Sequence, residues 1–406
     1  MQGKTLLRIA ALALALAGSA AAQARLQTLF EFTGKSADAP WSNVVFDAAG
    51  NLYGTTELGG TYDSGTVFEL TPTASGAWTR TVLYEFTGKD DGGRPQAGLI
   101  FDAAGNLYGT TGAGGINSCP YGCGVVFELS PAGEGLWTES VLHTFTAGAD
   151  GASPIANLIF DAAGNLYGTT WEGGYRNSFC YLGCGVIFEL TPSATGWTEA
   201  VLYTFMDGLD GSNSWAGLTF DTAGNLYGVA WNAGAHGAGD VFKLTPNSDG
   251  SWTQTVLYAF EGGTGGANSQ STLIFDSAGN LYGTARNSNG IVFELVPNSD
   301  GTWTEHTLHS FLGGPDGANP YAGLVFDSAG NLYGTTNAGD PDGYGIIFEL
   351  SPKATGGWSY HVLYDMKDTP GAYPRAGLVL DGKGNLYGTT YGDSKKTFGS
   401  VFEITP

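Results

Sequence analysis

The sequence predicts an all-β protein, a seven-bladed β-propeller of four-stranded blades, on three observations. Short runs of β-branched and aromatic residues are bounded throughout by Gly, Pro, Asn and Asp, which is typical of strands. Gly accounts for 66 of 406 residues and aromatic residues for 13%, which favours many short strands joined by tight turns. The string Asp-x-x-Gly-Asn-Leu-Tyr-Gly occurs seven times, starting at Asp47, Asp102, Asp161, Asp221, Asp276, Asp327 and Asp381.

The second copy shows the four strands expected in each unit. Residues 98–102 (GLIFD) form the first strand, and an AAG turn joins them to the second strand, residues 106–111 (NLYGTT). A glycine-rich loop precedes the third strand, residues 124–129 (GVVFEL), and a turn containing Pro leads to the fourth, residues 137–145 (WTESVLHTF). Four such strands every 51 to 60 residues, without helical periodicity, predict one propeller blade per repeat.

The two ends of the chain predict how the ring closes. Residues 26–32 (LQTLFEF) match a fourth strand such as residues 81–86 (TVLYEF), but no first three strands precede them. The last unit ends after its third strand, residues 401–404 (VFEI). We therefore expect the N-terminal strand to complete the last blade, which leaves no open sheet edge.

The first 24 residues have the features of a signal peptide. Lys4 and Arg8 precede an apolar run at residues 9–18, and residues 22–24 (AQA) match a cleavage site. The run is too short to span a bilayer as a stable helix. We expect cleavage after residue 24, or otherwise after residue 22, and export to the periplasm or the medium as a soluble protein.

The remaining residues, 25–406, are expected to form a single propeller, and they are strongly acidic. Without the two cations of the signal peptide, 14 Lys and Arg stand against 38 Asp and Glu, a balance of −24. Such a surface repels phosphate backbones and anionic lipid head groups. We therefore expect neither nucleic acid nor membrane insertion, and we expect a monomer.

The four cysteines lie in two matching segments, Cys119-Pro-Tyr-Gly-Cys123 and Cys180-Tyr-Leu-Gly-Cys184. Export favours disulfides, and four cysteines allow three pairings, of which we favour the two local ones. A zinc site built from both segments is the alternative. A bridge across five residues contributes little chain entropy, so these disulfides would stiffen loops more than they hold the fold.

At this point the repeat resembles a known family. Units such as residues 98–131 (GLIFDAAGNLYGTT…GVVFELSP) resemble the GloVer tandem repeat of exported bacterial proteins described as choice-of-anchor. The resemblance covers nearly all of residues 25–406. It implies an exported, β-propeller-like repeat protein and no particular activity.

Residues present in nearly every unit are expected to serve the blade, because a single ligand seldom needs seven identical contacts. The Asp of the repeated string is expected to cap a tight turn; calcium is the alternative, but the dense Asp-x-Asp-x-Asp-Gly pattern is absent. The Asp-Gly-x-x-Pro strings between units also predict turns rather than metal sites. We expect no metal and no cofactor. A recurring Glu, replaced by Lys in the fourth unit, is not expected to be catalytic: Glu69, Glu128, Glu189, Glu294, Glu349 and Glu403.

The tryptophans divide into a repeated and a non-repeated set. Six open the fourth strands and are expected to pack between blades: Trp78, Trp137, Trp197, Trp252, Trp303 and Trp358. Of the other four, Trp41 and Trp215 lie just before a first strand, where other units have Gln96, Ile155, Gln270, Tyr321 and Arg375. Trp171 and Trp231 lie just after a second strand, where other units have Glu57, Gly112, Arg286, Asn337 and Tyr391.

These two columns should be neighbours. Counting outward from the turn predicts that their members are directly opposed across the two strands. All seven pairs should then surround the mouth of the central channel, on the face with the long, variable loops. The predicted pairs are Trp41/Glu57, Gln96/Gly112, Ile155/Trp171, Trp215/Trp231, Gln270/Arg286, Tyr321/Asn337 and Arg375/Tyr391.

Aromatic faces beside amides and guanidinium groups suit sugar rings, which combine C–H patches with many hydroxyls. The sequence therefore predicts a non-catalytic propeller that binds a glycan or a similar polyhydroxylated ligand at the channel mouth. The alternative for the columns themselves is that they are solvent positions or packing. The candidate ligand-binding residues are Trp41, Glu57, Trp171, Trp215, Trp231, Arg286, Tyr321, Arg375 and Tyr391.

Two other functions stay open. A polysaccharide lyase or hydrolase could use His236, with Asp240 nearby, together with Glu57 and the arginines of the same face. Against it, the sequence shows no nucleophile arrangement and no three-ligand metal set, and the fold alone does not imply catalysis. The second is a protein-interaction scaffold in the cell envelope, suggested by the fold. The other four histidines are expected on the outer rim, in fourth strands: His143, His306, His309 and His361.

Overall fold

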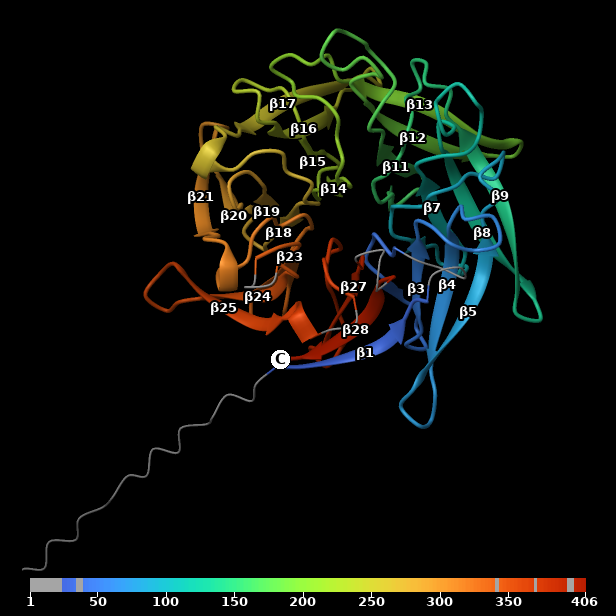
Figure 1. Ribbon diagram of the computed structural model, residues 1–406. Coiled ribbons are helices and arrows are strands. Elements are labelled where there is room, and N and C mark those ends of the chain that lie inside the picture. Colours follow the sequence, from blue (N-terminus) through green and yellow to red (C-terminus); the bar gives the residue numbers. More distant parts are fainter. Residues whose placement is uncertain (1–23, 34–38, 340–342, 369–370, 393–397) are drawn as a thin grey trace, which may run out of the picture.

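The computed structural model describes residues 24–33, 39–339, 343–368, 371–392 and 398–406, which form a ring of seven four-stranded antiparallel sheets (Figure 1). Within this part of the chain the only helices are three short 3-10 turns, η1 (Gly263–Gly265), η2 (Gly314–Asp316) and η3 (Met366–Asp368). The predicted seven-bladed, all-β propeller is confirmed. Apart from Ala24, the expected signal peptide lies outside the described residues.

Each blade runs from a two-residue strand beside the channel to a long strand at the rim. Blades 1 and 2 consist of β2 (Val45–Phe46), β3 (Leu52–Thr56), β4 (Thr66–Pro72) and β5 (Trp78–Glu85), then β6 (Ile100–Phe101), β7 (Leu107–Thr111), β8 (Val125–Gly133) and β9 (Leu136–Thr144). Blades 3 and 4 consist of β10 (Ile159–Phe160), β11 (Leu166–Thr169), β12 (Val186–Ser193) and β13 (Gly196–Thr204), then β14 (Thr219–Phe220), β15 (Leu226–Ala230), β16 (Asp240–Pro246) and β17 (Trp252–Ala259). Blades 5 and 6 consist of β18 (Ile274–Phe275), β19 (Leu281–Ala285), β20 (Ile291–Pro297) and β21 (Trp303–Ser310), then β22 (Val325–Phe326), β23 (Leu332–Thr336), β24 (Ile346–Pro352) and β25 (Trp358–Asp365). Blade 7 consists of β26 (Val379–Leu380), β27 (Leu386–Thr390), β28 (Ser400–Thr405) and β1 (Arg25–Glu31).

The N-terminal strand closes the ring as predicted. β1 pairs antiparallel with β28, from Arg25 opposite Thr405 to Glu31 opposite Ser400, so the first and last strands lie side by side in Figure 1. The guanidinium carbon of Arg80, in blade 1, lies 5.3 Å from the ring centre of Phe30 in β1. The closing strand is therefore packed against the first blade as well as hydrogen-bonded to the last.

The repeated turn satisfies its own aspartate. In blade 1, Asp47 Oδ1 accepts hydrogen bonds from the amides of Ala49 and Asn51, each at 2.8 Å. Its Oδ2 accepts from Asn51 Nδ2 at 2.8 Å and from Tyr53 Oη at 3.3 Å. Both oxygens are thus used by donors of the turn itself, as expected for a turn cap.

The same bonds recur in the other six turns. Burial alone raises the pKa of Asp102, but hydrogen bonds from Asn106, Ala104 and Tyr108 favour the charged form and bring the pKa below its ordinary value. The turn of blade 2 therefore favours the ionised form of its aspartate.

The glycine of Leu-Tyr-Gly makes room for the phenylalanine of the next strand. A Cβ on Gly228 in β15 would lie 2.6 Å from Cζ of Phe242 in β16, and the same is true of Gly54 and Phe68 at 2.7 Å. Both phenylalanines are fully buried. The Gly–Phe pair is thus one steric unit, which accounts for two further letters of the repeat.

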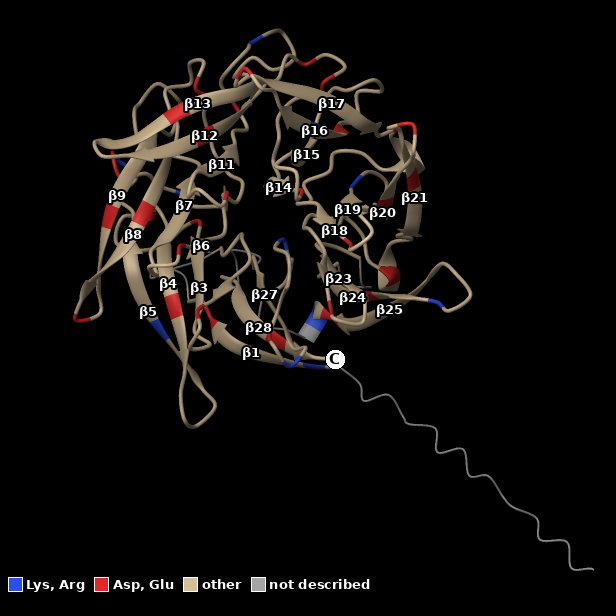
Figure 2. Cartoon of the chain, turned by 180° about the vertical axis from the view of Figure 1, so that it is seen from behind, with Lys and Arg blue, Asp and Glu red and all other residues tan. Residues whose placement is uncertain are grey.

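Contacts between blades use the repeated aromatic residues. Tyr53 in blade 1 lies edge-on to Phe101 and to Trp137 of blade 2, with ring centres 5.1 and 6.4 Å apart. The Tyr53 hydroxyl also donates to Glu69 at 2.9 Å, so the recurring glutamate of the third strand has a structural partner. Acidic residues recur in this way on β4, β8 and β12 (Figure 2). The repeated tryptophans pack between blades, as expected.

The aspartate of the inter-blade loops fixes the end of the fourth strand. Asp91 accepts from the amide of Thr87 at 2.8 Å and from Tyr84 Oη at 3.1 Å. In blade 5 the position of Tyr84 is taken by His309, whose Nε2 lies 3.1 Å from Asp316 Oδ2. These loops are turns, as predicted, and their aspartate also contacts a side chain of the fourth strand by a hydrogen bond.

Two of the four fourth-strand histidines therefore do not lie on a free outer surface. His309 stacks on Tyr360 of the next blade with ring centres 3.7 Å apart, and burial lowers the pKa of His143, although nearby Asp150 raises it. His306 and His361 are exposed. All four histidines lie in fourth strands at the rim, as predicted, and His309 also contacts the next blade.

Candidate functional site: the channel mouth

The predicted cross-strand pairs at the channel mouth are wrong by two residues. In blade 2 the first two strands pair Ile100 with Tyr108, as the counting rule requires. Farther toward the mouth, however, the amide of Gly112 donates to the carbonyl of Arg94 at 3.1 Å instead of facing Gln96. The other blades show related shifts, so the set of pairs from Trp41/Glu57 to Arg375/Tyr391 is not directly opposed.

A left-handed residue before the first strand accompanies this shift in every blade. Arg94 has a φ of 53° and precedes Pro95, which has no N–H and cannot continue the ladder. Ser214 and Ser269 replace the proline in blades 4 and 5, where the shift also occurs, so the left-handed residue is the common feature. The left-handed residues, one per blade, are Ala39, Arg94, Ser153, Asn213, Asn268, Asn319 and Tyr373.

The four non-repeated tryptophans form one continuous cluster at the mouth. Trp41 of blade 1 and Trp215 of blade 4 meet across the ring, with ring centres 6.4 Å apart and planes inclined by 27°. Trp171 lies edge-on to Trp215 at 4.7 Å and to Trp231 at 5.2 Å. All four keep part of their surface exposed. The indoles gather at a single opening, as their two columns in the sequence predict.

A second group of candidate residues continues the cluster on the side of blades 5 to 7. The guanidinium carbon of Arg375 lies 4.3 Å from the ring centre of Trp41 and 4.1 Å from that of Tyr391. Arg286 lies 4.0 Å from the ring centre of Tyr321, and Arg375 is 5.9 Å from the same ring. Cations and aromatic rings therefore alternate around this half of the mouth.

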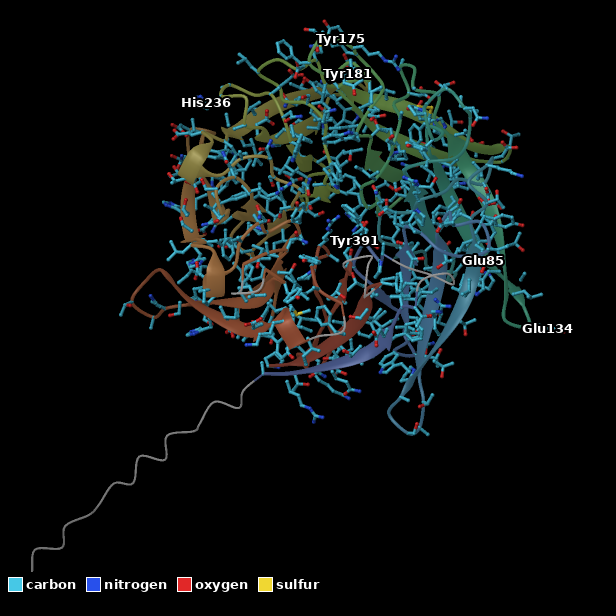
Figure 3. All side chains as sticks on the ribbon, viewed as in Figure 1. Glu85, Glu134, Tyr175, Tyr181, His236 and Tyr391 are labelled. Atoms are coloured by element: carbon cyan, nitrogen blue, oxygen red, sulfur yellow. A yellow bond between two sulfur atoms is a disulfide. The ribbon has the colours of Figure 1, made fainter. Side chains whose placement is uncertain are left out.

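Glu57 completes the set on the side of blade 1. It is 8% exposed and accepts hydrogen bonds from Gln96 Nε2 at 2.9 Å and from Tyr391 Oη at 3.5 Å. Figure 3 places Tyr391 near the centre of the ring, beside the channel. The structure thus brings together all nine candidate residues, mostly through contacts between blades.

The mouth encloses a hollow of about 220 Å³. Beneath it the first strands approach one another: Asn157 donates from Nδ2 to Asn43 Oδ1 at 3.2 Å and accepts from the amide of Gly98 at 2.6 Å. On the other side a Cβ on Gly323 would lie 2.7 Å from the carbonyl of Thr272. The channel is therefore narrow below the aromatic cluster, and the hollow is a cup.

Several residues of the cup were not among the predicted site residues. Gln96, Ile155 and Gln270 line it beside the tryptophans, and Asn43, Asn157 and Thr272 line it farther down. The deeper column shows a readable signal in the sequence, because blades 1, 3 and 5 replace the glycine that the other four blades have at this position. It reads Asn43, Gly98, Asn157, Gly217, Thr272, Gly323 and Gly377.

Four buried donors at the mouth have no hydrogen-bond acceptor among the described residues. They are Trp231 Nε1, Arg286 Nε, Arg375 Nε and Asn337 Nδ2. Neither arginine forms an ion pair within the described part of the chain. Buried polar groups are nearly always hydrogen-bonded. The other buried side-chain atoms without a partner among the described residues belong to Arg80, Glu139, His143 and Glu199 of the fourth strands and to Asp240.

His236 and Asp240 lie in different surroundings. His236 is exposed, and Figure 3 places it at the outer edge of the ring, away from the channel. Asp240 is fully buried at the start of β16, and neither of its carboxylate oxygens has a hydrogen-bond partner among the described residues. Burial, together with nearby Asp210, raises the pKa of Asp240 well above its ordinary value. The structure therefore does not bring His236 to the aromatic cluster at the mouth.

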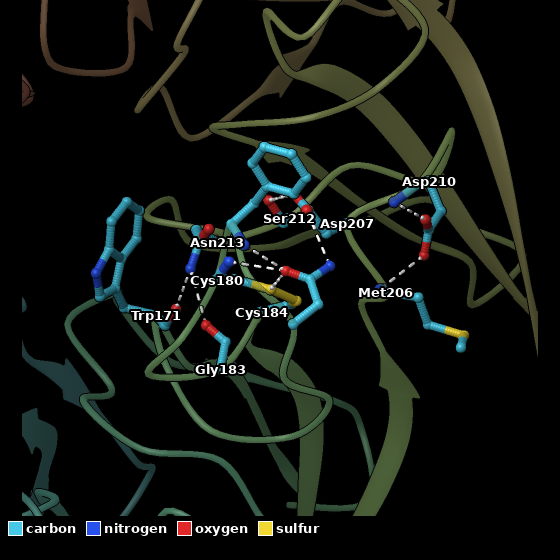
Figure 4. Close-up of a disulfide and its surroundings, with 12 residues drawn as sticks. Trp171, Cys180, Gly183, Cys184, Met206, Asp207, Asp210, Ser212 and Asn213 are labelled. Atoms are coloured by element: carbon cyan, nitrogen blue, oxygen red, sulfur yellow. Dashed lines mark hydrogen bonds between the residues drawn. A yellow bond between two sulfur atoms is a disulfide. The ribbon is translucent and has the colours of Figure 1, made fainter.

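Both disulfides form as the favoured local pairs, Cys119–Cys123 and Cys180–Cys184. In blade 3 the bridge is tied to the mouth through Asn213, whose amide donates to the carbonyl of Cys184 at 2.7 Å and whose Nδ2 donates to the carbonyl of Trp171 at 2.7 Å (Figure 4). The disulfide loop thus helps to position a tryptophan of the cluster.

The disulfides also bear on the compartment. Paired cysteines indicate a protein that works outside the reducing cytoplasm. Within the described residues, no helix has the length and apolar character needed to cross a membrane.

The fold and the mouth together define a tandem-repeat β-propeller with one non-repeated aromatic cup. A model of the Gloeobacter/Verrucomicrobia repeat matches residues 19–179, 117–304 and 284–406. The chain therefore belongs to this repeat family, in agreement with the resemblance seen in its sequence. The comparison with curated proteins gave no match.

Three solved structures are similar at low sequence identity. A gluconolactonase from Xanthomonas campestris is 15% identical, with 94% of this chain and 89% of that chain covered and a TM-score of 0.44. A luciferin-regenerating enzyme is 11% identical, with 94% of this chain and 95% of that chain covered and a TM-score of 0.45. A fungal alcohol oxidase of the AA5 family, in complex with copper, is 14% identical, with 92% of this chain and 75% of that chain covered and a TM-score of 0.54. At such identities the similarity concerns the fold alone.

Proposed function

We propose that this protein is an exported, non-catalytic propeller, in the periplasm or the medium, that binds a glycan or a similar polyhydroxylated ligand in the cup. The observation that carries the proposal is the clustering of Trp41, Trp171, Trp215 and Trp231 at one opening. A sugar ring has C–H faces that pack on indoles and hydroxyls that need hydrogen-bond partners.

The polar groups of the cup support the same class of ligand. The side chains of Gln96 and Gln270 line the hollow near the mouth, and those of Asn43 and Asn157 line it farther down. A polyhydroxylated ligand provides acceptors in several directions. Apolar walls with a few directed polar groups are the usual composition of a small-molecule site.

The arrangement of ionisable groups favours binding over catalysis. Glu57 is held by Gln96 and Tyr391, and His236 lies away from the mouth. A lyase or hydrolase on this face would need a proton donor and acceptor at the reacting bond. Incubation with polysaccharides, followed by assays for new reducing ends and unsaturated uronates, tests that alternative; activity lost in Glu57→Gln would replace our proposal.

Tryptophan fluorescence tests the binding directly. We expect a sugar from a panel of neutral and acidic glycans to change the emission of the wild type, because the cluster tryptophans would lose water contacts. Trp231→Ala should weaken that binding by about tenfold or more, the usual effect of losing an aromatic anchor.

The matched control is Trp303→Phe, a change in a repeated tryptophan that contacts Tyr227 of the preceding blade. It should leave the dissociation constant unchanged. The proposal fails if every glycan leaves the emission of the wild type unaltered, or if Trp231→Ala binds as the wild type does. A stoichiometric protein partner recovered instead would favour the envelope scaffold.

A further inference from the structure

The two arginines at the mouth are an unexplained feature of an acidic protein. The chain has only 16 Lys and Arg against 38 Asp and Glu. Even so, Arg286 and Arg375 come together at one end of the channel and make no ion pair with a described carboxylate. Neither belongs to the repeat, because other blades have different residues in their columns.

We propose that the ligand of the cup is an acidic sugar whose carboxylate is bound between Arg286 and Arg375. This inference rests on the proposed glycan-binding function and names the substrate class. The alternative anions, a carboxylate without a sugar or a sulfated sugar, are arms of the test below.

The aromatic rings hold both guanidinium groups in place. Tyr321 lies against both, at 4.0 Å from Arg286 and 5.9 Å from Arg375, and Trp41 and Tyr391 pack on Arg375. Stacking fixes the planes of these side chains before a ligand arrives. A planar guanidinium fork that is already oriented loses little conformational freedom on binding a carboxylate.

The burial of these groups points to an anion rather than to a neutral acceptor. The Nε atoms of Arg286 and Arg375 are buried without an acceptor among the described residues. A charged group that is partly removed from water and unpaired is unfavourable. Arg375 lines the hollow, and a carboxylate beside it would supply the opposite charge to both guanidinium groups and acceptors for the N–H groups that they turn to the ligand.

The only carboxylate among the candidate residues does not serve this purpose. Glu57 is farther than ion-pair distance from both guanidinium groups, and its oxygens accept from Gln96 and Tyr391. Tyr391 contacts the two groups with different parts of its side chain, because its hydroxyl donates to Glu57 and its ring packs on Arg375. The cup therefore has an acceptor side and a cationic side.

This polarity suits a sugar with one carboxylate rather than a dense polyanion. The pyranose ring would pack on Trp215, its carboxylate would face the arginines, and its hydroxyls would meet Gln96 and Gln270. The net charge of −22 repels a highly charged chain at long range. A uronic acid unit combines the required C–H face, hydroxyls and single charge.

The test compares matched acidic and neutral sugars by calorimetry and by tryptophan fluorescence. The pairs are oligogalacturonate with its methyl ester, and glucuronate with glucose. We expect the acidic member to bind about tenfold or more tightly, and we expect Arg375→Met and Arg286→Met to remove most of that preference. The affinity for the neutral member should change less than about twofold, and the preference should shrink at high salt.

Arg176→Met is the control for charge, because Arg176 is exposed on a loop of blade 3 and its guanidinium donates to the carbonyl of Ala147. It should leave both affinities unchanged. Arg375→Lys should recover part of the preference, since it keeps the charge and loses the fork. Unchanged melting temperatures show that the variants are folded.

The outcomes separate this inference from the proposed function. If the acidic and neutral sugars bind equally and the arginine variants bind as the wild type does, the acidic-sugar inference is wrong and glycan binding stands. If acetate or citrate competes as strongly as glucuronate, or if only sulfated sugars bind, the uronate assignment is overturned. If no sugar binds at all, both proposals fail.

Discussion

The two faces of the propeller carry opposite kinds of sequence. On one face the first and second strands of all seven blades are joined by the same Asp-x-x-Gly-Asn turn, with the same hydrogen bonds to the aspartate. On the other face the corresponding positions hold Trp, Gln, Ile, Tyr, Arg, Glu, Gly and Asn. The same strands connect both faces, so the difference does not come from the scaffold.

The difference between the two faces indicates where a single ligand would contact a repeated structure. At the turn face every contact lies within one blade or between neighbouring blades, so each blade needs the same residues. At the mouth, Trp41 meets Trp215, three blades away. A ligand on the axis touches several blades at once and needs a different group from each, so the repeat is free to vary there.

The largest effect is expected from a repeated glycine. Gly228→Ala would place a Cβ 2.6 Å from Cζ of Phe242, and we expect the free energy of unfolding to fall by about 3 kcal/mol, the upper end of overpacking costs. At the mouth, the Cβ of Gly112→Ala would meet Ile155 Cγ2 at 3.0 Å, so the loss should be under about 1 kcal/mol. Urea denaturation of both variants measures the two losses of unfolding free energy. Equal losses would contradict the expected difference between the repeated and the varied positions.

The next effect concerns the turn aspartates. Asp102→Ala and Asp327→Ala each remove the acceptor of two backbone amides, an asparagine and a tyrosine, and should each lower the free energy of unfolding by about 1–2 kcal/mol. The two losses should agree, because the turns are structurally equivalent. A loss in only one blade, or one reversed by calcium, would contradict a purely structural role.

A third test uses a departure from the repeat outside the cup. Asp240 is buried where blade 1 has Thr66, whose hydroxyl bonds Thr56. Because burial raises the pKa of Asp240 above its unfolded value, the wild type keeps the associated stability at low pH and loses it as pH rises through the folded pKa. Asp240→Asn should therefore be more stable than the wild type at pH 8, with the difference vanishing near pH 4 in urea denaturation.

Asp90→Asn, at an exposed position, is the control for that test and should show no such pH dependence. If Asp240→Asn is less stable than the wild type at pH 8, Asp240 is charged and has a partner in solution. In either case sugar binding should be unchanged, since Asp240 does not line the cup.

The smallest effect is expected at a varied column of the rim. Burial, and to a lesser degree Asp91, raises the pKa of Glu139 to about 7. Its stabilising contribution is thus present at low pH and is lost as pH rises through about 7. Glu139→Gln should flatten the pH dependence of the melting temperature between pH 5 and pH 8 without affecting binding. The change is conservative, since blade 4 has Gln254 at the same position. A change in sugar affinity would show that varied columns outside the mouth also contribute to recognition.

Much of this structure is readable from local patterns. The seven turns, the strand order within a blade and the local disulfides follow from short segments whose hydrogen bonds or covalent links lie close in the chain. The closing strand pairs with the far end of the chain, but its match to the other fourth strands predicts that pairing. The pairs at the mouth were misjudged because a left-handed residue before Pro95, and its counterparts in the other blades, displace the first strand. The nearness in sequence of His236 and Asp240 was misleading, since one side chain faces solvent and the other the core.

The sequence by itself determined the blade, the number of blades and the face on which the repeat breaks down, because these depend on interactions repeated at short range. Only the tertiary structure decided which residues meet across the axis: that Arg286 and Arg375 share Tyr321, and that Trp41 lies against Trp215. Those contacts join residues from different blades, and their geometry depends on how closely seven sheets pack around one channel. A pattern within one blade cannot predict how far apart residues of different blades lie across the channel.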